Sequence, residues 1–223
     1  MLFSLIELRQ DIALHNTASL CRSEVYGGHQ LVWDLFSDGP DRQRDFLYRQ
    51  EATGIRPKFY AVSRRPPVDH KGFWAISSKN YDPRIARGER LAFTLRVNPV
   101  KTKKDDKGRQ HRHDVVMEAR RQFFSSRKDH PMQEVIQEEG GRWLLERCCA
   151  LGFDVITTSL RIDGYRQHKF YKGKQMPPVS FSTLDINGIL TVTDSEEFVE
   201  KCLFSGIGPA KGFGCGLMLV RRI

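Results

Sequence analysis

Residues 193–220 read TDSEEFVEKCLFSGIGPAKGFGCGLMLV, and this order predicts a helix, then a glycine loop, then a strand. Thr193 and Glu196 have the spacing of a capping box at the start of a helix. Five glycines follow within residues 206–216, and the apolar run at 217–220 is typical of a strand. A P-loop and a dinucleotide-binding loop both place their helix after the glycines, so this order excludes both.

The glycine loop, residues 206–216, has two interpretations that the sequence leaves open. Backbone without side chains lets N–H groups approach a phosphodiester closely, and Lys211 would add positive charge. In that interpretation Gly208, Gly212 and Gly214 contact the same ligand as Lys211. The alternative is a sharp turn that needs a positive φ at several positions.

Upstream of the loop, the second half of the chain alternates between helix and strand patterns. Residues 115–124 and 143–151 have helical spacing, and residues 155–162 alternate as a strand does. Asn187-Gly188 interrupts the apolar stretch 179–193. This dipeptide is either a tight hairpin turn or a bulge within one bent strand.

The first half repeats this theme. Residues 2–8 read as a strand and residues 25–36 as a short helix with one apolar face. Residues 44–51 and 58–63 are short and aromatic, which predicts a hairpin. A weakly helical stretch follows, and residues 91–97 then give the clearest alternating strand of this half.

Each half thus combines strands with helices, which predicts an α+β fold. The economical architecture is two tandem ferredoxin-like (RRM-like) domains, each an antiparallel sheet backed by helices. We expect the domains at residues 1–103 and 115–223, with a basic linker at 104–114. The polar, basic residues 101–113 read as a linker or as a long flexible hairpin. RNA-recognition modules share this topology, but fold alone assigns no function.

The composition favours a folded protein with a polyanionic partner. With 39% hydrophobic residues and 14 phenylalanines, the 223 residues can bury a core. Lysine and arginine outnumber acidic residues by 36 to 27, a net charge of +9. No apolar run reaches ~18 residues, so neither a membrane span nor a membrane partner is expected. The five cysteines form no C-x-x-C motif, which fits a reducing cytoplasm.

Tyr26 and His29 are the candidate catalytic residues. Residues three apart on a helix are neighbours, and the first turn of a helix favours a bound phosphate. An imidazole can both remove and supply a proton near neutrality, as attack by a ribose 2′-hydroxyl on the adjacent phosphate requires. A nearby phenol can orient the imidazole. A structural histidine at the edge of the core is the alternative interpretation of His29.

Two clusters of basic residues are candidate nucleic-acid contacts, because cations bind phosphates and aromatic rings stack on bases. Solvated surface loops are the alternative interpretation of both. The first cluster contributes Lys101, Lys103 and Lys104. The second, which is interleaved with aromatic residues, consists of Arg161, Arg166, Lys169, Lys172 and Lys174.

No metal site is expected. His111 and His113 lie among lysines and arginines, whose charges oppose a bound cation. No carboxylate pair of a two-metal nuclease stands out, and no G-x-S-x-G motif is present. If the chain cuts a nucleic acid, RNA cleavage without a metal is therefore favoured over hydrolysis of DNA.

Three stretches and the glycine loop together resemble one known family. The stretches are YGGHQLVWDLF at residues 26–36, RDFLYR at 44–49 and RVNPVKT at 96–102. In the same order, and over nearly its whole length, the chain resembles the CRISPR-associated endoribonuclease family CasE. Members of this family are the repeat-processing subunit of the type I-E surveillance complex, Cascade.

The resemblance implies one metal-independent cut at the 3′ base of the stem-loop in a CRISPR repeat transcript, with no cofactor. The family's active-site histidine corresponds to His29 and its companion tyrosine to Tyr26. The resemblance also implies that the mature crRNA hairpin stays bound within Cascade and that the basic hairpin near residues 161–174 enters the major groove of the stem. A non-catalytic RNA-binding or assembly subunit is the alternative that the basic residues equally support.

Overall fold

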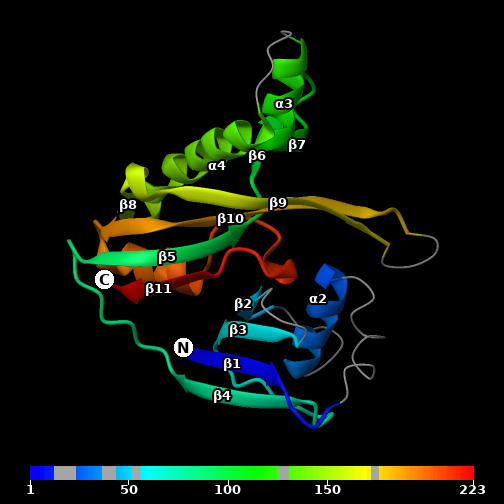
Figure 1. Ribbon diagram of the computed structural model, residues 1–223, viewed down its shortest axis with the longest axis vertical. Coiled ribbons are helices and arrows are strands. Elements are labelled where there is room, and N and C mark those ends of the chain that lie inside the picture. Colours follow the sequence, from blue (N-terminus) through cyan, green and yellow to red (C-terminus); the bar gives the residue numbers. More distant parts are fainter. Residues whose placement is uncertain (13–23, 37–43, 52–55, 126–130, 172–175) are drawn as a thin grey trace.

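The computed structural model describes residues 1–12, 24–36, 44–51, 56–125, 131–171 and 176–223. Two antiparallel sheets lie one above the other along the long axis of the molecule, and each is accompanied by helices (Figure 1). A two-stranded hairpin forms a third, small sheet. This is the expected α+β architecture of two ferredoxin-like domains. No helix within the described ranges is long and apolar enough to cross a membrane.

The N-terminal sheet has the strand order β2-β3-β1-β4, and all of its neighbours are antiparallel. Read from the other edge, this is the 4-1-3-2 order of a ferredoxin-like sheet. Helix α2 packs on one face, where the predicted apolar stripe meets the core; Val32 and Phe59 are both fully buried. Its elements are β1 (Leu2–Leu8), α2 (Glu24–Leu35), β2 (Phe46–Glu51), β3 (Lys58–Ser63) and β4 (Trp74–Asn80).

The prediction of a weakly helical stretch between β3 and the next strand is wrong, because β4 lies there. This strand pairs with β1 along its whole length, from Trp74 opposite Leu8 to Asn80 opposite Leu2. Trp74 is buried, but most of the following side chains are polar and exposed. An edge strand of this kind is stabilised by backbone pairing rather than by an apolar pattern, so periodicity alone does not reveal it.

The C-terminal sheet has the order β11-β5-β10-β8, and β9 also pairs with β10. Its strands are β5 (Arg90–Val97), β8 (Phe153–Val155), β9 (Arg161–Phe170), β10 (Val179–Val192) and β11 (Met218–Arg222). With β5 counted as first, β9 as second, β10 as third and β11 as last, this is again the 4-1-3-2 order. The second ferredoxin-like unit therefore begins at β5.

The predicted strand at 91–97 is thus confirmed, but not in the expected unit. It pairs with β10 and β11 rather than with any strand of the N-terminal sheet. The sheets consequently divide between β4 and β5, at residues 81–89, and not at 104–114. Sequence order alone could not show this, because strand pairing is a property of the whole fold.

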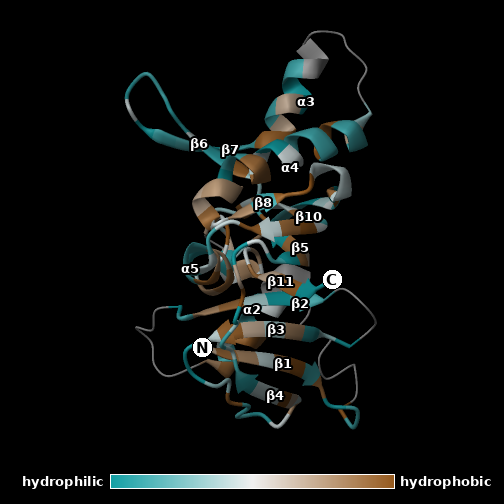
Figure 2. Cartoon of the chain, turned by 90° about the vertical axis from the view of Figure 1, so that its left-hand side faces the viewer, coloured by the Kyte–Doolittle hydropathy of each residue, from teal (hydrophilic) through white to brown (hydrophobic). Residues whose placement is uncertain are grey.

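Residues 101–113 form a hairpin, the second of the two interpretations offered for this segment. Strands β6 (Val100–Lys104) and β7 (Gln110–Asp114) pair antiparallel. The hairpin is hydrophilic and projects away from the rest of the chain beside helices α3 (Val115–Ser125) and α4 (Met132–Cys148) (Figure 2). Both helices confirm the helical spacing read there, although α4 starts earlier and is extended by a short 3₁₀ turn, η1 (Cys149–Leu151).

The single strand predicted at 155–162 is wrong. The chain leaves β8 at Val155, makes a 3₁₀ turn, η2 (Thr157–Ser159), and enters β9 at Arg161. The Ser159 hydroxyl fixes the turn: it donates to the Ile156 carbonyl at 2.6 Å and accepts from the Ile189 N–H at 2.9 Å. Such local side-chain bonds let serine compete with a regular strand.

The Asn187-Gly188 dipeptide lies inside one continuous strand, β10, so it is not a hairpin turn. Pairing with β5 runs through both residues without interruption, and the register shift on the β9 side lies between Thr183 and Asp185. Gly188 makes room for an aromatic ring, because a Cβ atom there would lie 3.1 Å from Phe93. The bulge expected in a bent strand is therefore present, but a few residues earlier.

The opening stretch, 193–220, folds in the predicted order. The cap is Asp194 rather than Thr193, since the Asp194 carboxylate accepts the Glu197 N–H at 3.0 Å. Helix α5 (Ser195–Glu197) continues as a π-helix, η3 (Phe198–Phe204). The glycine loop follows with a 3₁₀ turn, η4 (Lys211–Phe213), and leads into β11.

Candidate active site

The imidazole of His29 meets the glycine loop across 183 residues of sequence. His29 lies on α2, is half-buried, and places its Nδ1 2.5 Å from the carbonyl oxygen of Gly212. Its ring centroid lies 4.9 Å from that of Phe213 and 5.4 Å from that of Trp33. The first helix and the C-terminal loop therefore form one site at the boundary between the two sheets.

This contact fixes which imidazole nitrogen carries the proton. A carbonyl oxygen can only accept a hydrogen bond, so Nδ1 must be the N–H donor. In the neutral ring the acceptor is then Nε2, the nitrogen that can take up a proton. The Gly212 carbonyl also stabilises the charged ring that forms when Nε2 takes up a proton, as a backbone or carboxylate partner does in other histidine sites.

Tyr48 donates to the same carbonyl. Its hydroxyl donates to the Gly212 oxygen at 3.1 Å, and its ring is 1% exposed on β2. Burial raises the pKa of this phenol far above its usual value, so it stays protonated and remains a donor. Sequence reasoning missed this residue, although it lies in the RDFLYR stretch; no spacing links a strand tyrosine to a loop 164 residues away.

The glycine loop is the sharp turn of the second interpretation. Gly208, Gly214 and the non-glycine Ala210 have φ values of 74°, 80° and 58°. Gly214 also allows the loop to lie on the Tyr48 ring, since a Cβ there would be 3.2 Å from it. Positive φ and this close approach explain why small residues are needed here.

Several amides of the loop are hydrogen-bonded within the fold. Its amides at Phe213 and Gly214 donate to carbonyls within the loop, and that of Gly216 donates to the Arg96 carbonyl at 2.7 Å. What the loop turns toward His29 is the carbonyl of Gly212. The loop therefore orients the histidine, and its contact with a phosphate remains a prediction.

Lys211 and Arg44 add positive charge beside the loop. The Lys211 ammonium donates to the Ser205 carbonyl at 2.6 Å, at the end of η3. Burial, and then the nearby Arg44 charge, lower its pKa. Arg44 donates to the Phe46 carbonyl at 2.8 Å, and burial lowers its pKa as well. The prediction that Lys211 contributes a cation at the loop fits this placement, while Arg44 was not foreseen.

Tyr26 is described by its backbone alone. Its backbone lies in the first turn of α2, as predicted, but its side chain is outside the described part of the structure. Its role as an orienting phenol remains a prediction.

Comparison with known proteins identifies the family. The sequence model of the family described as CRISPR associated protein matches residues 1–222. The chain belongs to this family. It is 26% identical over 197 residues to the CRISPR system Cascade subunit CasE of Escherichia coli K12, which covers 87% of this chain and 90% of the relative. The predicted resemblance to CasE is confirmed.

Two solved structures of CRISPR proteins share the fold over essentially the whole chain. One is Thermus thermophilus Cse3 bound to an RNA representing a pre-cleavage complex, with a TM-score of 0.68, 19% identity, and coverage of 99% of this chain and 98% of that one. The other is Cas6e from Escherichia coli K-12, with a TM-score of 0.66, 23% identity and full coverage of both chains. These likenesses confirm the tandem ferredoxin-like fold expected of a CRISPR-associated protein.

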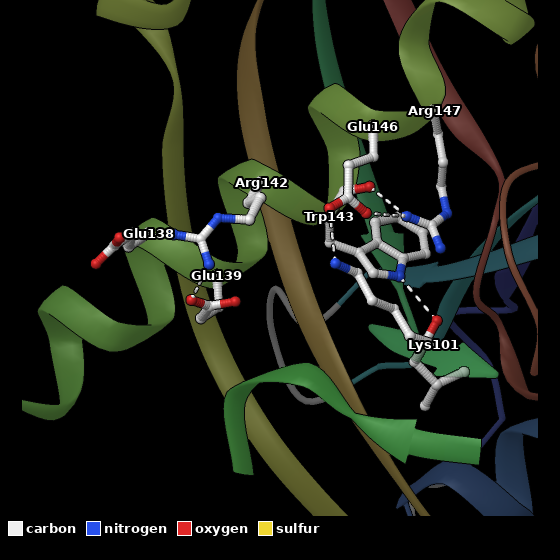
Figure 3. A network of polar contacts seen from close by, with 8 residues as sticks. Lys101, Glu138, Glu139, Arg142, Trp143, Glu146 and Arg147 are labelled. Atoms are coloured by element: carbon white, nitrogen blue, oxygen red, sulfur yellow. Dashed lines mark hydrogen bonds and ion pairs between the residues drawn. The ribbon is translucent and has the colours of Figure 1, made fainter. Parts of the chain in front are cut away.

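In this CRISPR-associated protein, two of the lysines predicted to bind RNA have carboxylate partners. Lys101 of β6 pairs with Glu146 of α4 at 2.6 Å, beside the Trp143 indole, whose N–H donates to the Val100 carbonyl (Figure 3). Lys103 pairs with Glu118 at 2.5 Å. These pairs hold the β6–β7 hairpin against the helices. They lie at the surface, where a phosphate can compete for the lysines.

The remaining basic candidates follow the two hairpins. Lys104 is exposed on β6, and Arg161, Arg166 and Lys169 are exposed along β9. The predicted basic hairpin is confirmed as β9 paired with β10, which extends beyond the rest of the C-terminal sheet (Figure 1). Lys172 and Lys174 fall outside the described residues.

Metal-binding geometry is not found in the described ranges, where no three His, Cys, Asp or Glu side chains are grouped to hold an ion. His111 instead bonds Asp105 through Nε2 at 3.0 Å, and this bond is the main cause of a lowered Asp105 pKa. The pair closes the tip of the β6–β7 hairpin.

Proposed function

We propose that this chain is an endoribonuclease that binds the stem-loop of a CRISPR repeat transcript and cuts it once, at the 3′ base of the stem, without a metal. The observation that carries the proposal is the His29–Gly212 contact, which makes Nδ1 the donor and Nε2 the acceptor of the neutral ring, in reach of the glycine loop. The relatives support it, since one is a Cascade subunit and another is a CRISPR endoribonuclease bound to a 19-nucleotide RNA.

The reaction is an internal transesterification. The 2′-hydroxyl of the nucleotide 5′ to the cut loses its proton and its oxygen bonds to phosphorus, while the bond from phosphorus to the 5′-oxygen breaks and that oxygen takes a proton. The products are a 2′,3′-cyclic phosphate and a 5′-hydroxyl, so no co-reactant is consumed. Nε2 of His29 serves as the base or the acid in this exchange, and Tyr26 orients the site.

Binding rests on the basic surface. The exposed residues Arg161, Arg166 and Lys169 line one strand of the extended hairpin, and Lys104 lies on the other hairpin. Lysine and arginine on such strands neutralise phosphates and make affinity fall with salt. The proposed basic finger is therefore the β9–β10 hairpin, which enters the major groove of the stem.

After cleavage the chain retains the mature crRNA hairpin and acts as a subunit of the type I-E surveillance complex in the cytoplasm. Support comes from the Cascade relative and from the cysteines: within the described residues, Cys148, Cys149, Cys202 and Cys215 are free thiols. The alternative function is a non-catalytic RNA-binding or assembly subunit, for which the basic strands suffice and His29 is structural.

A cleavage assay separates the two functions. Repeat RNA is incubated with the protein in EDTA, and the ends are mapped against an RNA with 2′-deoxyribose 5′ to the cut. We expect one cut at the 3′ base of the stem, undiminished by EDTA and absent from the deoxy RNA. Tight binding of RNA that stays intact would support the non-catalytic alternative.

A further inference from the structure

A pocket of about 470 Å³ opens beside the glycine loop, between Phe213 and residues of the C-terminal unit. It lies where β10 extends past the end of β5: pairing with β5 stops at Leu184, while pairing with β9 continues to Val179. Helix α3 and β7 form the opposite wall. A larger hollow of about 550 Å³ over α4 contains no residue of the glycine loop and is unrelated to this site.

The lining combines aromatic, polar and cationic groups. The Phe181 and Phe213 rings lie 5.1 Å apart, inclined by 29°, and provide an apolar surface. Arg112 and Arg121 line the opposite wall, and the Gln167 amide adds hydrogen-bonding groups. Flat aromatic surface, hydrogen-bonding groups and positive charge are what a nucleotide base with its phosphate requires. The volume is within the ~300–1,000 Å³ of small-ligand pockets.

The polar floor of the pocket is held in place by other side chains. Asp114 accepts from the Ser182 hydroxyl, from the Tyr165 hydroxyl at 2.9 Å and from the Met117 N–H at 2.9 Å. Asn98 donates to the Ser182 carbonyl at 2.7 Å. A pocket whose walls are fixed before binding loses less entropy when a ligand enters.

Phe213 connects the pocket to the catalytic histidine. The centroid of the Phe213 ring lies 4.9 Å from that of the His29 imidazole, and the same ring stacks on Phe181 in the pocket. A phosphate at His29 therefore has the pocket as its immediate neighbour. A nucleotide joined to that phosphate can place its base in the pocket if the base is unpaired.

We propose that this pocket binds the base of the first nucleotide 3′ to the cut. The inference rests on the proposed function, in which the cut lies at the 3′ base of the stem. The nucleotide 5′ to the cut is then paired within the stem and is unable to enter. The first nucleotide on the 3′ side is unpaired, and it leaves with the released fragment, so the pocket acts on the substrate and not on the retained product.

The test uses RNA with an abasic ribose at this position, which keeps both the phosphates and the leaving oxygen. Binding is measured with RNAs that also carry 2′-deoxyribose 5′ to the cut, so that the RNA stays intact and affinity is measured independently of cleavage. Loss of one stacked base should weaken affinity by about 5- to 150-fold. An abasic site at the third nucleotide 3′ to the cut should change little. The product hairpin lacks the first nucleotide 3′ to the cut, so its affinity should be the same for the unaltered protein and for variants that fill the pocket.

A matched variant assigns the effect to the pocket. Met117→Trp fills the pocket from α3, and Ser180→Tyr does so from an exposed position of β10 in case the first variant folds poorly. In these variants, native and abasic RNA should bind equally. Equal binding by the unaltered protein, or an abasic effect that persists in both folded variants, would overturn the proposal. If the abasic effect is present but native RNA is never cut, the pocket stands and the proposed nuclease function fails.

Discussion

Replacing Tyr48 with phenylalanine removes its hydroxyl donor from the Gly212 carbonyl, to which His29 also donates within the described residues. The ring is 1% exposed, so water has no route to replace the hydroxyl. The carbonyl keeps its bond from His29 Nδ1 at 2.5 Å, so it is not left unpaired. The expected cost is that of one net hydrogen bond, about 0.5–1.5 kcal/mol in the free energy of unfolding. For a chain of this size, that lowers the Tm by roughly 1–6 °C.

Tyr48→Phe should slow RNA cleavage by less than removal of the His29 imidazole does. The loop and His29 remain together, but the carbonyl that orients the ring is held by one bond. We therefore expect the single-turnover cleavage rate constant to drop by up to about 10-fold with RNA affinity unchanged. Thermal melting and single-turnover cleavage of repeat RNA measure the two effects. Tyr60→Phe on the adjacent strand β3 is the control, because it makes the same chemical change away from the glycine loop.

Two results would refute this reasoning. If Tyr48→Phe matches Tyr60→Phe in both Tm and cleavage, the bond to Gly212 contributes nothing. If instead it abolishes cleavage at unchanged stability, Tyr48 acts on the substrate itself and is not a positioning residue.

Three further outcomes are expected. Gly214→Ala should lower the free energy of unfolding by about 1–2 kcal/mol, because the φ of Gly214 is 80° and the added Cβ would press on the Tyr48 ring. An unchanged midpoint in chemical denaturation would count against strain at this position. Lys169→Ala should weaken repeat RNA binding and reduce the salt dependence of log Kd by about 1, whereas an identical slope would remove Lys169 from the RNA contact. Burial raises the pKa of Tyr81 and Tyr165 to about 12, above the ~10 of the unfolded chain. The folded state therefore holds more protons between pH ~10 and ~12, and the free energy of unfolding should fall as pH rises through this range. Urea midpoints that stay level across this pH range would contradict the burial of both phenols.

The sequence was informative where local pattern and packing agree. The alternation of residues 91–97 and the stripe of α2 predict elements that the structure contains, because both bury one face against the core. The polar strand β4 has no such face beyond Trp74 and Ile76, so its existence depends on pairing with β1. The unit to which β5 belongs depends likewise on partners that lie far along the chain.

The candidate site shows the same limit. His29 and the glycine loop were each recognisable by residue type. The carbonyl of Gly212 and the hydroxyl of Tyr48 were not, since a backbone oxygen leaves no mark in a sequence and a strand tyrosine usually serves the core. Only the folded chain shows that the loop presents an acceptor to the imidazole.

The central claim is that Nε2 of His29 transfers the proton while Nδ1 is held by Gly212. His29→Asn tests it most directly, because the asparagine amide can donate to the Gly212 carbonyl as Nδ1 does but has no group in place of Nε2. Single-turnover cleavage of repeat RNA should fall by about 10²–10⁴-fold, with RNA affinity and Tm close to those of the unaltered protein. Cleavage by His29→Asn within a few-fold of the unaltered rate would contradict the account.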